Sequence, residues 1–553
     1  MNEKLTATWQ WLKNEKRTIW LEYSALALAV LLPLLLPGFI LTLDMVFTPT
    51  IAFPQDITNT YPLQLLLWSL HFVLPADIIQ KIILFVILLF SGVSMHSLLQ
   101  SLNMKERIGA DIWRLALYFG GIFYMINPFT YSRFMAGQWL FLLGYAMLPF
   151  FVKSLLKFFA APSRKTMTSL ALWSFAIITA SVHHIALLLL LALLVPLFAT
   201  VFHYWRKGQA KRYFAWSGAV IGINLVLCSY WLLPALFGGG TIGSVVTSRS
   251  SADFSAFATG GGGALGAIGE VVRLQGFWAE ARQLYTLPQD MIPAWGVFFL
   301  IVWIVMAVGA SKAWKASRML VALAITSIAL GIILAATPLI AWLSQYVPLV
   351  SGYREPDKFA NLIALGYAML GTLGVAFTAK WATDRFREIG GQAVIIVCLL
   401  LPLAITPAML WGFGGQLSPK QYPAGWYAMN EKLRKLPGTK RVLFLPWHQY
   451  MAFEFSGRII ATPAEKFFAV PVIASDDPEF GGVTPTIPDS EKSAITTALK
   501  HPETLVSTLT KHNVNYILLA DDDDSDSYAY LDKQAGVKQI AKNDSLALYE
   551  VAP

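Results

Sequence analysis

Long apolar runs separated by short polar segments dominate the pattern of this chain. A helix that crosses a lipid bilayer needs about 20 mostly apolar residues, and about eleven runs approach that length. They lie near residues 20–43, 77–100, 112–128, 138–156, 167–185, 186–204, 213–236, 293–311, 319–345, 359–379 and 392–412. The pattern therefore predicts a polytopic α-helical membrane protein, with a membrane domain over residues 18–412.

Three longer segments lack this pattern. Residues 44–76 form a loop whose "YPLQLLLWSLHFVLP" predicts an amphipathic helix on the membrane surface. Residues 237–292 form a second loop with glycine runs, which are typical of mobile or closely packed loops. Residues 413–553 are more polar, and short apolar strands there ("KRVLFLPW", "NVNYILLADD") alternate with a helical pattern ("SEKSAITTALKHPETLVSTLTKHN"). We expect a separate small α/β domain, with Asp521–Asp524 in a solvated loop.

The basic residues predict the orientation. They gather in the N-terminal segment 1–17 and in every second turn, at 105–114, 153–165, 206–212, 312–318 and 380–387. Cytoplasmic loops carry the excess of Lys and Arg, so the N-terminus is expected in the cytoplasm. An odd number of spans then places both long loops and the 413–553 domain outside.

Composition agrees with a protein built for lipid. The 553 residues are 56% hydrophobic and 14% charged, whereas soluble proteins carry roughly 25% charged residues. The net charge of +9 lies in short clusters between apolar runs and so indicates topology, not nucleic-acid binding. The two cysteines, Cys228 and Cys398, lie inside apolar runs, which excludes a disulfide framework or a zinc cluster. The first run is long and has no small-residue cleavage site, so we expect a retained span rather than a signal peptide.

Asp44 is the first candidate for chemistry, because it ends an apolar run on the expected outer side. A simple helix end at the membrane interface is the plain alternative. However, apolar surroundings disfavour a charged carboxylate and raise its pKa toward that of a useful base. Asp44 is therefore a candidate general base.

The second candidate is "SGYREPDKFANL", where Arg354, Glu355, Asp357 and Lys358 crowd around Pro356. Such a cluster also suits a charged helix cap with Pro in its first turn. Because other outer loops avoid basic residues, Arg354 and Lys358 are candidates for binding a phosphate.

Further polar residues gather on the same expected side. "INPFTYSRFMAGQW" carries Asn127, Tyr131, Arg133 and Gln138, either as a plain turn or with Arg133 as a third phosphate ligand. In "SVHHIA", His183 and His184 point about 100° apart on a helix, so at most one, taken here as His184, joins a site.

"GEVVRLQGFWAE" predicts a second surface helix that covers a lipid or acceptor, with Glu270 and Trp278 as candidates beside Arg273 and Glu280. There is no P-loop, dinucleotide fingerprint or zincin motif. No cofactor is therefore predicted, and no residue pattern supports a divalent metal.

An outward Asp after the first span, followed by a long outer loop with a surface helix, resembles the GT-C superfamily of membrane glycosyltransferases. "LTLDMVFTP", "NPFTYSRFMAGQW" and "YREPDKF" are similar to segments of prokaryotic arabinofuranosyltransferase-like and YfhO-like proteins. The resemblance implies Asp44 as catalytic base. The first outer loop has a lone Asp, with Asp56 further on, in place of the adjacent acidic pair of many members, which argues against a metal-dependent variant.

The resemblance implies an enzyme of the prokaryotic plasma (inner) membrane. It would transfer a sugar from a polyprenyl-phosphate-linked donor to an extracytoplasmic glycan, lipid or protein acceptor, with inversion. The alternatives are a non-catalytic transporter or an assembly factor for lipid-linked cell-envelope glycans, or a scaffold whose outer domain binds a partner. A transporter typically has repeated halves with charges at the membrane midplane, whereas the charges here gather at one face.

Overall fold

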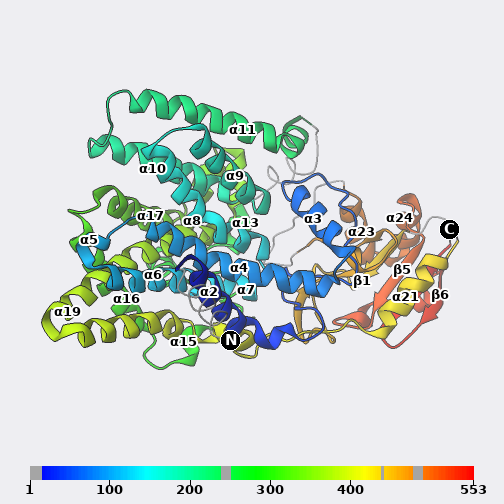
Figure 1. Cartoon of the computed structure of the whole chain (residues 1–553). Coiled ribbons are helices and arrows are strands. Elements are labelled where there is room, and N and C mark those ends of the chain that lie inside the picture. Colours follow the sequence, from blue (N-terminus) through cyan, green and yellow to red (C-terminus); the bar gives the residue numbers. More distant parts are fainter. Residues whose placement is uncertain (1–14, 238–250, 438–440, 478–489, 553) are drawn as a thin grey trace, which may run out of the picture.

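The computed structural model describes residues 15–237, 251–437, 441–477 and 490–552. It has a helical body and, at one end, a domain built around a sheet (Figure 1). The predicted cytoplasmic segment 1–17 lies, up to residue 14, outside the described residues, as does "GGGTIGS" in the second loop. A polytopic helical body with a C-terminal sheet domain agrees with the predicted fold class.

Eight helices among the described residues are long and apolar enough to cross a membrane. They are α2 (Glu15–Leu31) with η1 (Leu32–Leu35), α4 (Ala76–Gln100), α8 (Trp139–Ala160), α10 (His184–Val201), α11 (Gln209–Phe237), α16 (Gly296–Ala313), α17 (Arg318–Ala336) and α19 (Ala360–Ile405). Two predicted spans form shorter helices, α6 (Ala110–Met125) and α9 (Arg164–Ala180). Two others share α19, which leaves helical geometry at Phe386 and Arg387. Each predicted run is therefore mainly helical, and the number of crossings stays a prediction.

The first apolar run ends its helix earlier than the sequence predicts. We expected a span to residue 43, but helical structure ends at Leu35. Pro37 cannot donate the backbone hydrogen bond that would continue a helix. Phe39 then exchanges two backbone hydrogen bonds of 2.8 Å with Lys420. Asp44 consequently lies nine residues beyond η1 and does not cap the first helix.

Two other boundaries differ from the expectation. The predicted span 319–345 is divided, because α17 ends at Ala336 and Pro338 precedes a separate short helix, α18 (Leu339–Ser344). The turn between the fifth and sixth runs lies at residues 181–183, not at 185. Both His183 and His184 therefore stand at the start of α10.

α19 is held in place by a close helix crossing. A Cβ atom on Gly309 of α16 would overlap the carbonyl oxygen of Leu370 and approach the Gly374 nitrogen at 2.6 Å. Small residues that allow such backbone contact are typical of helix packing in membranes. This crossing holds the N-terminal half of α19 against α16.

The C-terminal domain confirms the predicted α/β class. Its five-stranded sheet has the order β4-β1-β5-β7-β6, with β1 and β5 inside the two predicted strands. The strands are β1 (Val442–Leu445), β4 (Val472–Ile473), β5 (Tyr516–Ala520), β6 (Val537–Lys542) and β7 (Leu546–Val551). Helix α21 (Ala424–Lys435) packs on one face, whereas α23 (Glu491–Lys500) and α24 (Leu505–Lys511) pack on the other.

A separate hairpin of β2 (Tyr450–Phe453) and β3 (Arg458–Ala461) joins this domain to the helical body. Leu43 forms a parallel bridge with Ile460, and its carbonyl oxygen accepts a 2.8 Å hydrogen bond from the Ala461 N–H. The core also places the boundary slightly after residue 413, since Leu417 still packs in the helical body. The first long loop is thus part of the domain contact.

The two long loops differ in their outcome. α3 (Tyr61–His71) confirms a helix in the first loop. In the second loop, α13 (Ser251–Ala256), α14 (Ala264–Val271) and α15 (Pro288–Met291) are short. The surface helix expected over residues 269–280 is wrong, because α14 ends at Val271 and Phe277, Trp278 and Ala279 turn into the core.

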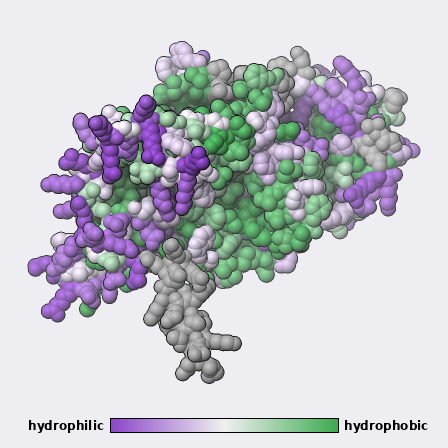
Figure 2. Space-filling view, turned by 45° about the horizontal axis from the view of Figure 1, so that its top comes forward, coloured by the Kyte–Doolittle hydropathy of each residue, from purple (hydrophilic) through white to green (hydrophobic). Residues whose placement is uncertain are grey.

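The surface agrees with a membrane protein. Figure 2 shows a broad hydrophobic band between hydrophilic groups at the two ends of the molecule. In Figure 1, α5 (Lys105–Ile108), in a turn expected to be cytoplasmic, lies far from the sheet domain. The relative placement fits the predicted topology, while the side that faces outward stays a prediction.

Cysteine labelling tests that orientation. In a background with Cys228 and Cys398 replaced by Ser, we expect a membrane-impermeant maleimide to label Ser527→Cys in intact spheroplasts. Lys105→Cys should react only after permeabilisation, because the two exposed positions are predicted on opposite sides. The reverse labelling pattern would invert the topology.

Candidate functional site

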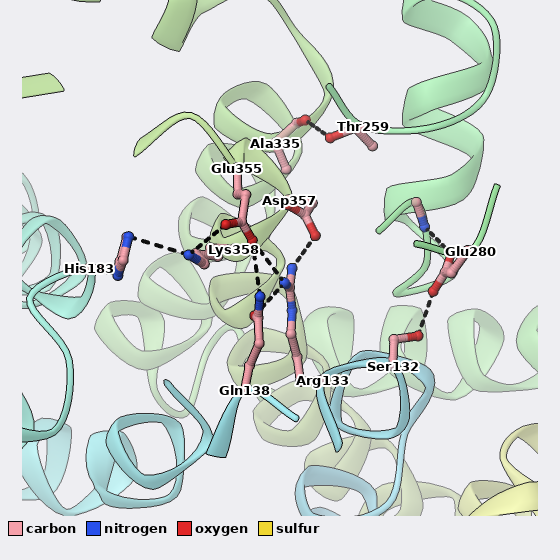
Figure 3. A network of polar contacts seen from close by, with 11 residues as sticks. Ser132, Arg133, Gln138, His183, Thr259, Glu280, Ala335, Glu355, Asp357 and Lys358 are labelled. Atoms are coloured by element: carbon pink, nitrogen blue, oxygen red, sulfur yellow. Dashed lines mark hydrogen bonds and ion pairs between the residues drawn. The ribbon is translucent and has the colours of Figure 1, made fainter. Parts of the chain in front are cut away.

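Arg133 lies at the centre of a buried polar network (Figure 3). Its side chain is 1% exposed and forms ion pairs with Asp357 and, at 3.6 Å, with Glu355. Its Nη1 also donates a 2.7 Å hydrogen bond to the Gln138 side chain. A phosphate would have to displace a carboxylate from Arg133. The contacts therefore give Arg133 a role in holding the site together.

Helix α7 (Pro128–Met135) presents Arg133, and its sequence explains why it starts where it does. Asn127 accepts a hydrogen bond from the Thr130 N–H while the Thr130 hydroxyl accepts one from the Asn127 N–H, and Pro128 occupies the first turn. This capping arrangement is the structural use of Asn at a helix start. Asn127 is fully buried, so the structure places this candidate in the support of the site.

Lys358 joins the network from η3 (Pro356–Phe359). Its ammonium lies 3.3 Å from Glu355 Oε1 and 3.3 Å from His183 Nε2. Burial acts to raise the pKa of Glu355, but the charges of Lys358 and Arg133 outweigh it and bring the pKa to about 2. Burial first, and then the Lys358 charge, lower the pKa of His183 to about 3. A neutral imidazole can therefore accept the hydrogen bond from Lys358.

The two histidines separate. His184 is fully buried, its ring centroid lies 4.6 Å from that of Phe141, and its Nε2 lies 3.2 Å from Asn361 Nδ2. Of the pair, the structure thus brings His183 and not the expected His184 to Lys358. His183 and His184 are adjacent at the start of α10, so their side chains point in different directions and only His183 reaches Lys358.

The backbone around Asp44 is fixed by the turn after α7. The Asp44 N–H donates to the Ala136 carbonyl at 3.1 Å, and the Thr42 hydroxyl donates to the Met135 carbonyl at 2.5 Å. Gly137 has φ +72°, and a Cβ there would overlap the Met45 backbone nitrogen. Only a glycine permits this approach. The turn that follows α7 therefore packs directly against the backbone of Asp44 and Met45.

The Asp44 carboxylate is partly buried and accepts a 2.6 Å hydrogen bond from the Tyr450 hydroxyl. Burial raises its pKa most strongly, the Tyr450 hydrogen bond opposes that rise, and the nearby Glu355 charge adds to it. Lys358 and Gln138 also lower the pKa. Asp44 is therefore in electrostatic contact with the network of Lys358 and Glu355.

Arg354 completes the cationic side of the site. Its guanidinium carbon lies 4.3 Å from the centroid of the Phe257 ring, within the range of a cation–π contact. The Arg354 charge also acts on the Tyr450 hydroxyl, lowering its pKa against a larger rise from burial. The structure thus brings Asp44, Arg354 and Lys358 into one region.

The remaining candidates are Glu270 and Trp278, and the Trp278 ring packs edge-on against Phe257, the ring that Arg354 contacts, with the centroids 5.6 Å apart. Glu270 pairs with Arg273 at 2.6 Å within one helical turn. Trp278 is buried, and the Arg282 guanidinium lies 5.4 Å from its ring. Neither contacts Asp44 or Lys358 in any hydrogen bond or ion pair described.

Glu280, in the same segment, contacts the helix that carries Arg133. Its two oxygens accept hydrogen bonds from the Ser132 hydroxyl and, at 2.7 Å, from the Gly276 N–H (Figure 3). Burial raises its pKa to about 7. A narrow cavity between it and Asp357 is lined by Ser132, Arg133 and Gln275 and has room for little more than a water molecule.

The arrangement can move a proton and attract an anion. Asp44 offers a partly exposed carboxylate of raised pKa, Lys358 acts on it with its positive charge, and Arg354 adds positive charge near Tyr450. Within the described part of the chain, no group of three or more His, Cys, Asp or Glu side chains is placed to hold a metal ion.

The fold resembles that of solved structures of arabinofuranosyltransferase AftD from Mycobacteria. The match to one structure has a TM-score of 0.64 at 13% sequence identity and covers 97% of this chain and 40% of AftD. Two classes of a point-mutant AftD each give a TM-score of 0.57 at 14% identity and cover 97% of this chain. No protein-family model and no curated protein sequence matches. This chain therefore shares the fold over about 40% of the AftD length.

Arg133→Met tests the network. The variant leaves Asp357 and Glu355 buried beside one fewer positive charge, which costs about 3–5 kcal/mol when a buried pair is broken. We expect a clear fall in the thermal unfolding midpoint in detergent.

Lys380→Met is the matched control, since Lys380 pairs with Asp384 at 3.4 Å on the exposed part of α19. Exposed pairs contribute about 0–1 kcal/mol. Equal midpoints for the two variants would contradict the role of Arg133.

Proposed function

We propose that this chain is a membrane glycosyltransferase that transfers a sugar from a polyprenyl-phosphate-linked donor to an extracytoplasmic glycan, lipid or protein acceptor. The observation that carries the proposal is the position of Asp44: a partly exposed carboxylate of raised pKa that interacts with the charge of Lys358 and accepts a hydrogen bond from Tyr450, whose hydroxyl is in turn influenced by Arg354. The fold likeness to AftD adds support at the level of architecture. It also makes an arabinofuranosyl donor the first to test.

In this mechanism Asp44 is the general base. It removes the proton from an acceptor hydroxyl while the hydroxyl oxygen attacks the anomeric carbon of the donor. The new glycosidic bond forms as the bond from the anomeric carbon to the phosphate oxygen breaks. A single displacement of this kind inverts the anomeric centre, and polyprenyl phosphate leaves.

The cations serve the departing phosphate. Negative charge grows on the phosphate oxygens in the transition state, and positive groups already in place stabilise it. Arg354 can offer a planar pair of donors, whereas Lys358 supplies a compact charge that is shared with Glu355. Arg133 acts behind them, since its own charge is matched by two carboxylates.

Asp44→Asn tests the base. Asn keeps the size of the side chain but cannot accept the proton, so transfer from a radiolabelled polyprenyl-phosphate arabinofuranose should fall roughly 10²-fold or more. The measurement is the initial rate of labelled glycan formation by the purified protein in liposomes.

Asp56→Asn is the control, because Asp56 is exposed in the same loop, and its rate should equal that of the wild type. Undiminished transfer by Asp44→Asn would remove Asp44 from the mechanism. Movement of the lipid-linked donor across the liposome membrane without bond formation would favour the transporter alternative.

The pH profile gives a second test. A general base works only when deprotonated, so kcat/KM should fall as the pH drops through the raised pKa of Asp44. We expect the midpoint of this acid limb above the usual aspartate value of about 3.9. The residual activity of Asp44→Asn should lack the limb, and an unchanged limb would assign it to another group.

A further inference from the structure

We propose that Tyr450 is the positioning residue for Asp44, so that the C-terminal domain completes the catalytic centre. The catalytic role in this inference rests on the proposed function, whereas the contact between Tyr450 and Asp44 is independent of it. Tyr450 and Asp44 are 406 residues apart in sequence. The domain would then do more than present an acceptor.

The geometry fixes both ends of the contact. The Tyr450 hydroxyl donates to Asp44 Oδ1 at 2.6 Å. Tyr450 is paired with Ala461 across the hairpin, and the Ala461 N–H donates to the carbonyl of Leu43, the residue before Asp44. One strand register therefore sets the position of the donor and of the acceptor together.

A second contact reinforces this register. Arg458, which begins β3, donates a 3.2 Å hydrogen bond from Nη1 to the Thr42 hydroxyl. Thr42 in turn donates to the Met135 carbonyl at the end of α7. The hairpin is thus linked to the turn that holds the Asp44 backbone, and a displaced hairpin would move the carboxylate.

The chemistry assigns the direction of the hydrogen bond. Burial raises the pKa of Tyr450 well above its usual value, and the Asp44 charge raises it further. Tyr450 therefore stays protonated and acts as a hydrogen-bond donor, not as a base. A hydrogen bond to a carboxylate at this distance is a strong, charge-assisted one, and it favours the charged, proton-accepting form of Asp44.

Two effects follow for a base. The bond limits how far burial can raise the pKa of Asp44, and it fixes the rotation of the carboxylate toward the incoming hydroxyl. Small errors in such orientation cost large factors in rate. A tyrosine that only fills space would have neither effect, because phenylalanine fills the same space.

Tyr450→Phe in the full-length protein in lipid nanodiscs separates these accounts. Infrared difference spectroscopy, with Asp44→Asn to assign the band, follows the titration of the Asp44 carboxyl. We expect the midpoint of that titration to rise by about one pH unit on loss of the hydrogen bond. We also expect kcat to fall roughly tenfold with little change in the KM for the lipid-linked donor.

Tyr549→Phe is the matched control. Its hydroxyl also donates to an aspartate, Asp532, at 2.9 Å in the same domain, so the variant loses the same kind of bond away from Asp44. We expect its Asp44 titration, kcat and thermal midpoint to match the wild type. The thermal midpoint of Tyr450→Phe should lie close to that of this control.

The two readouts distinguish the claims. An unchanged Asp44 titration in Tyr450→Phe overturns the positioning role, whatever the transfer rate. A raised titration midpoint supports the contact even if the wild type transfers no sugar, a result that would overturn only the proposed function. A lower kcat with an unchanged titration and a lower thermal midpoint also overturns the proposal, because it indicates a structural role.

Discussion

The site depends on the buried pairing of Arg133 with Asp357 and Glu355. This pairing ties α7 to the segment around η3, just before α19, although the two segments are separated by more than 200 residues. A buried guanidinium without partners would be very costly, so the two segments must stay together. Because the turn that directly follows α7 holds the Asp44 backbone through Ala136 and Gly137, the position of the candidate base depends on this ion pairing.

The charge balance of the network explains a division of roles among the cations. Two carboxylates, Asp357 and Glu355, face two buried cations, Arg133 and Lys358. Glu355 is paired with both cations. Arg354 lies over the Phe257 ring. Under the proposed mechanism, Arg133 holds the two segments together, and Lys358 and Arg354 stabilise the leaving phosphate.

The sequence predicted the parts that depend on local pattern. Apolar runs such as 77–100 and 138–156 became α4 and α8, and the alternating apolar segments around Val442 and Tyr516 became strands. The end of the first run was predicted wrongly because its apolar residues after Pro37 are buried inside the protein, Ile40 and Leu43 in the helical body and Phe39 and Leu41 against the C-terminal domain. Hydropathy cannot distinguish such burial from contact with lipid. The roles of His183, Glu280 and Tyr450 arise from contacts between distant segments, and no local spacing marks them.

Two opposing effects set the pKa of the candidate base, Asp44. Burial raises the pKa of Asp44, and the Tyr450 hydroxyl from the C-terminal domain lowers it. Burial alone would make the carboxylate more readily protonated, while a fully solvated carboxylate would be a weaker base. An intermediate pKa therefore requires that Tyr450 and Asp44 keep a fixed relative position. The strand register between Leu43 and the β2–β3 hairpin provides that relation, which gives a physical reason for the domain to be built against the first loop.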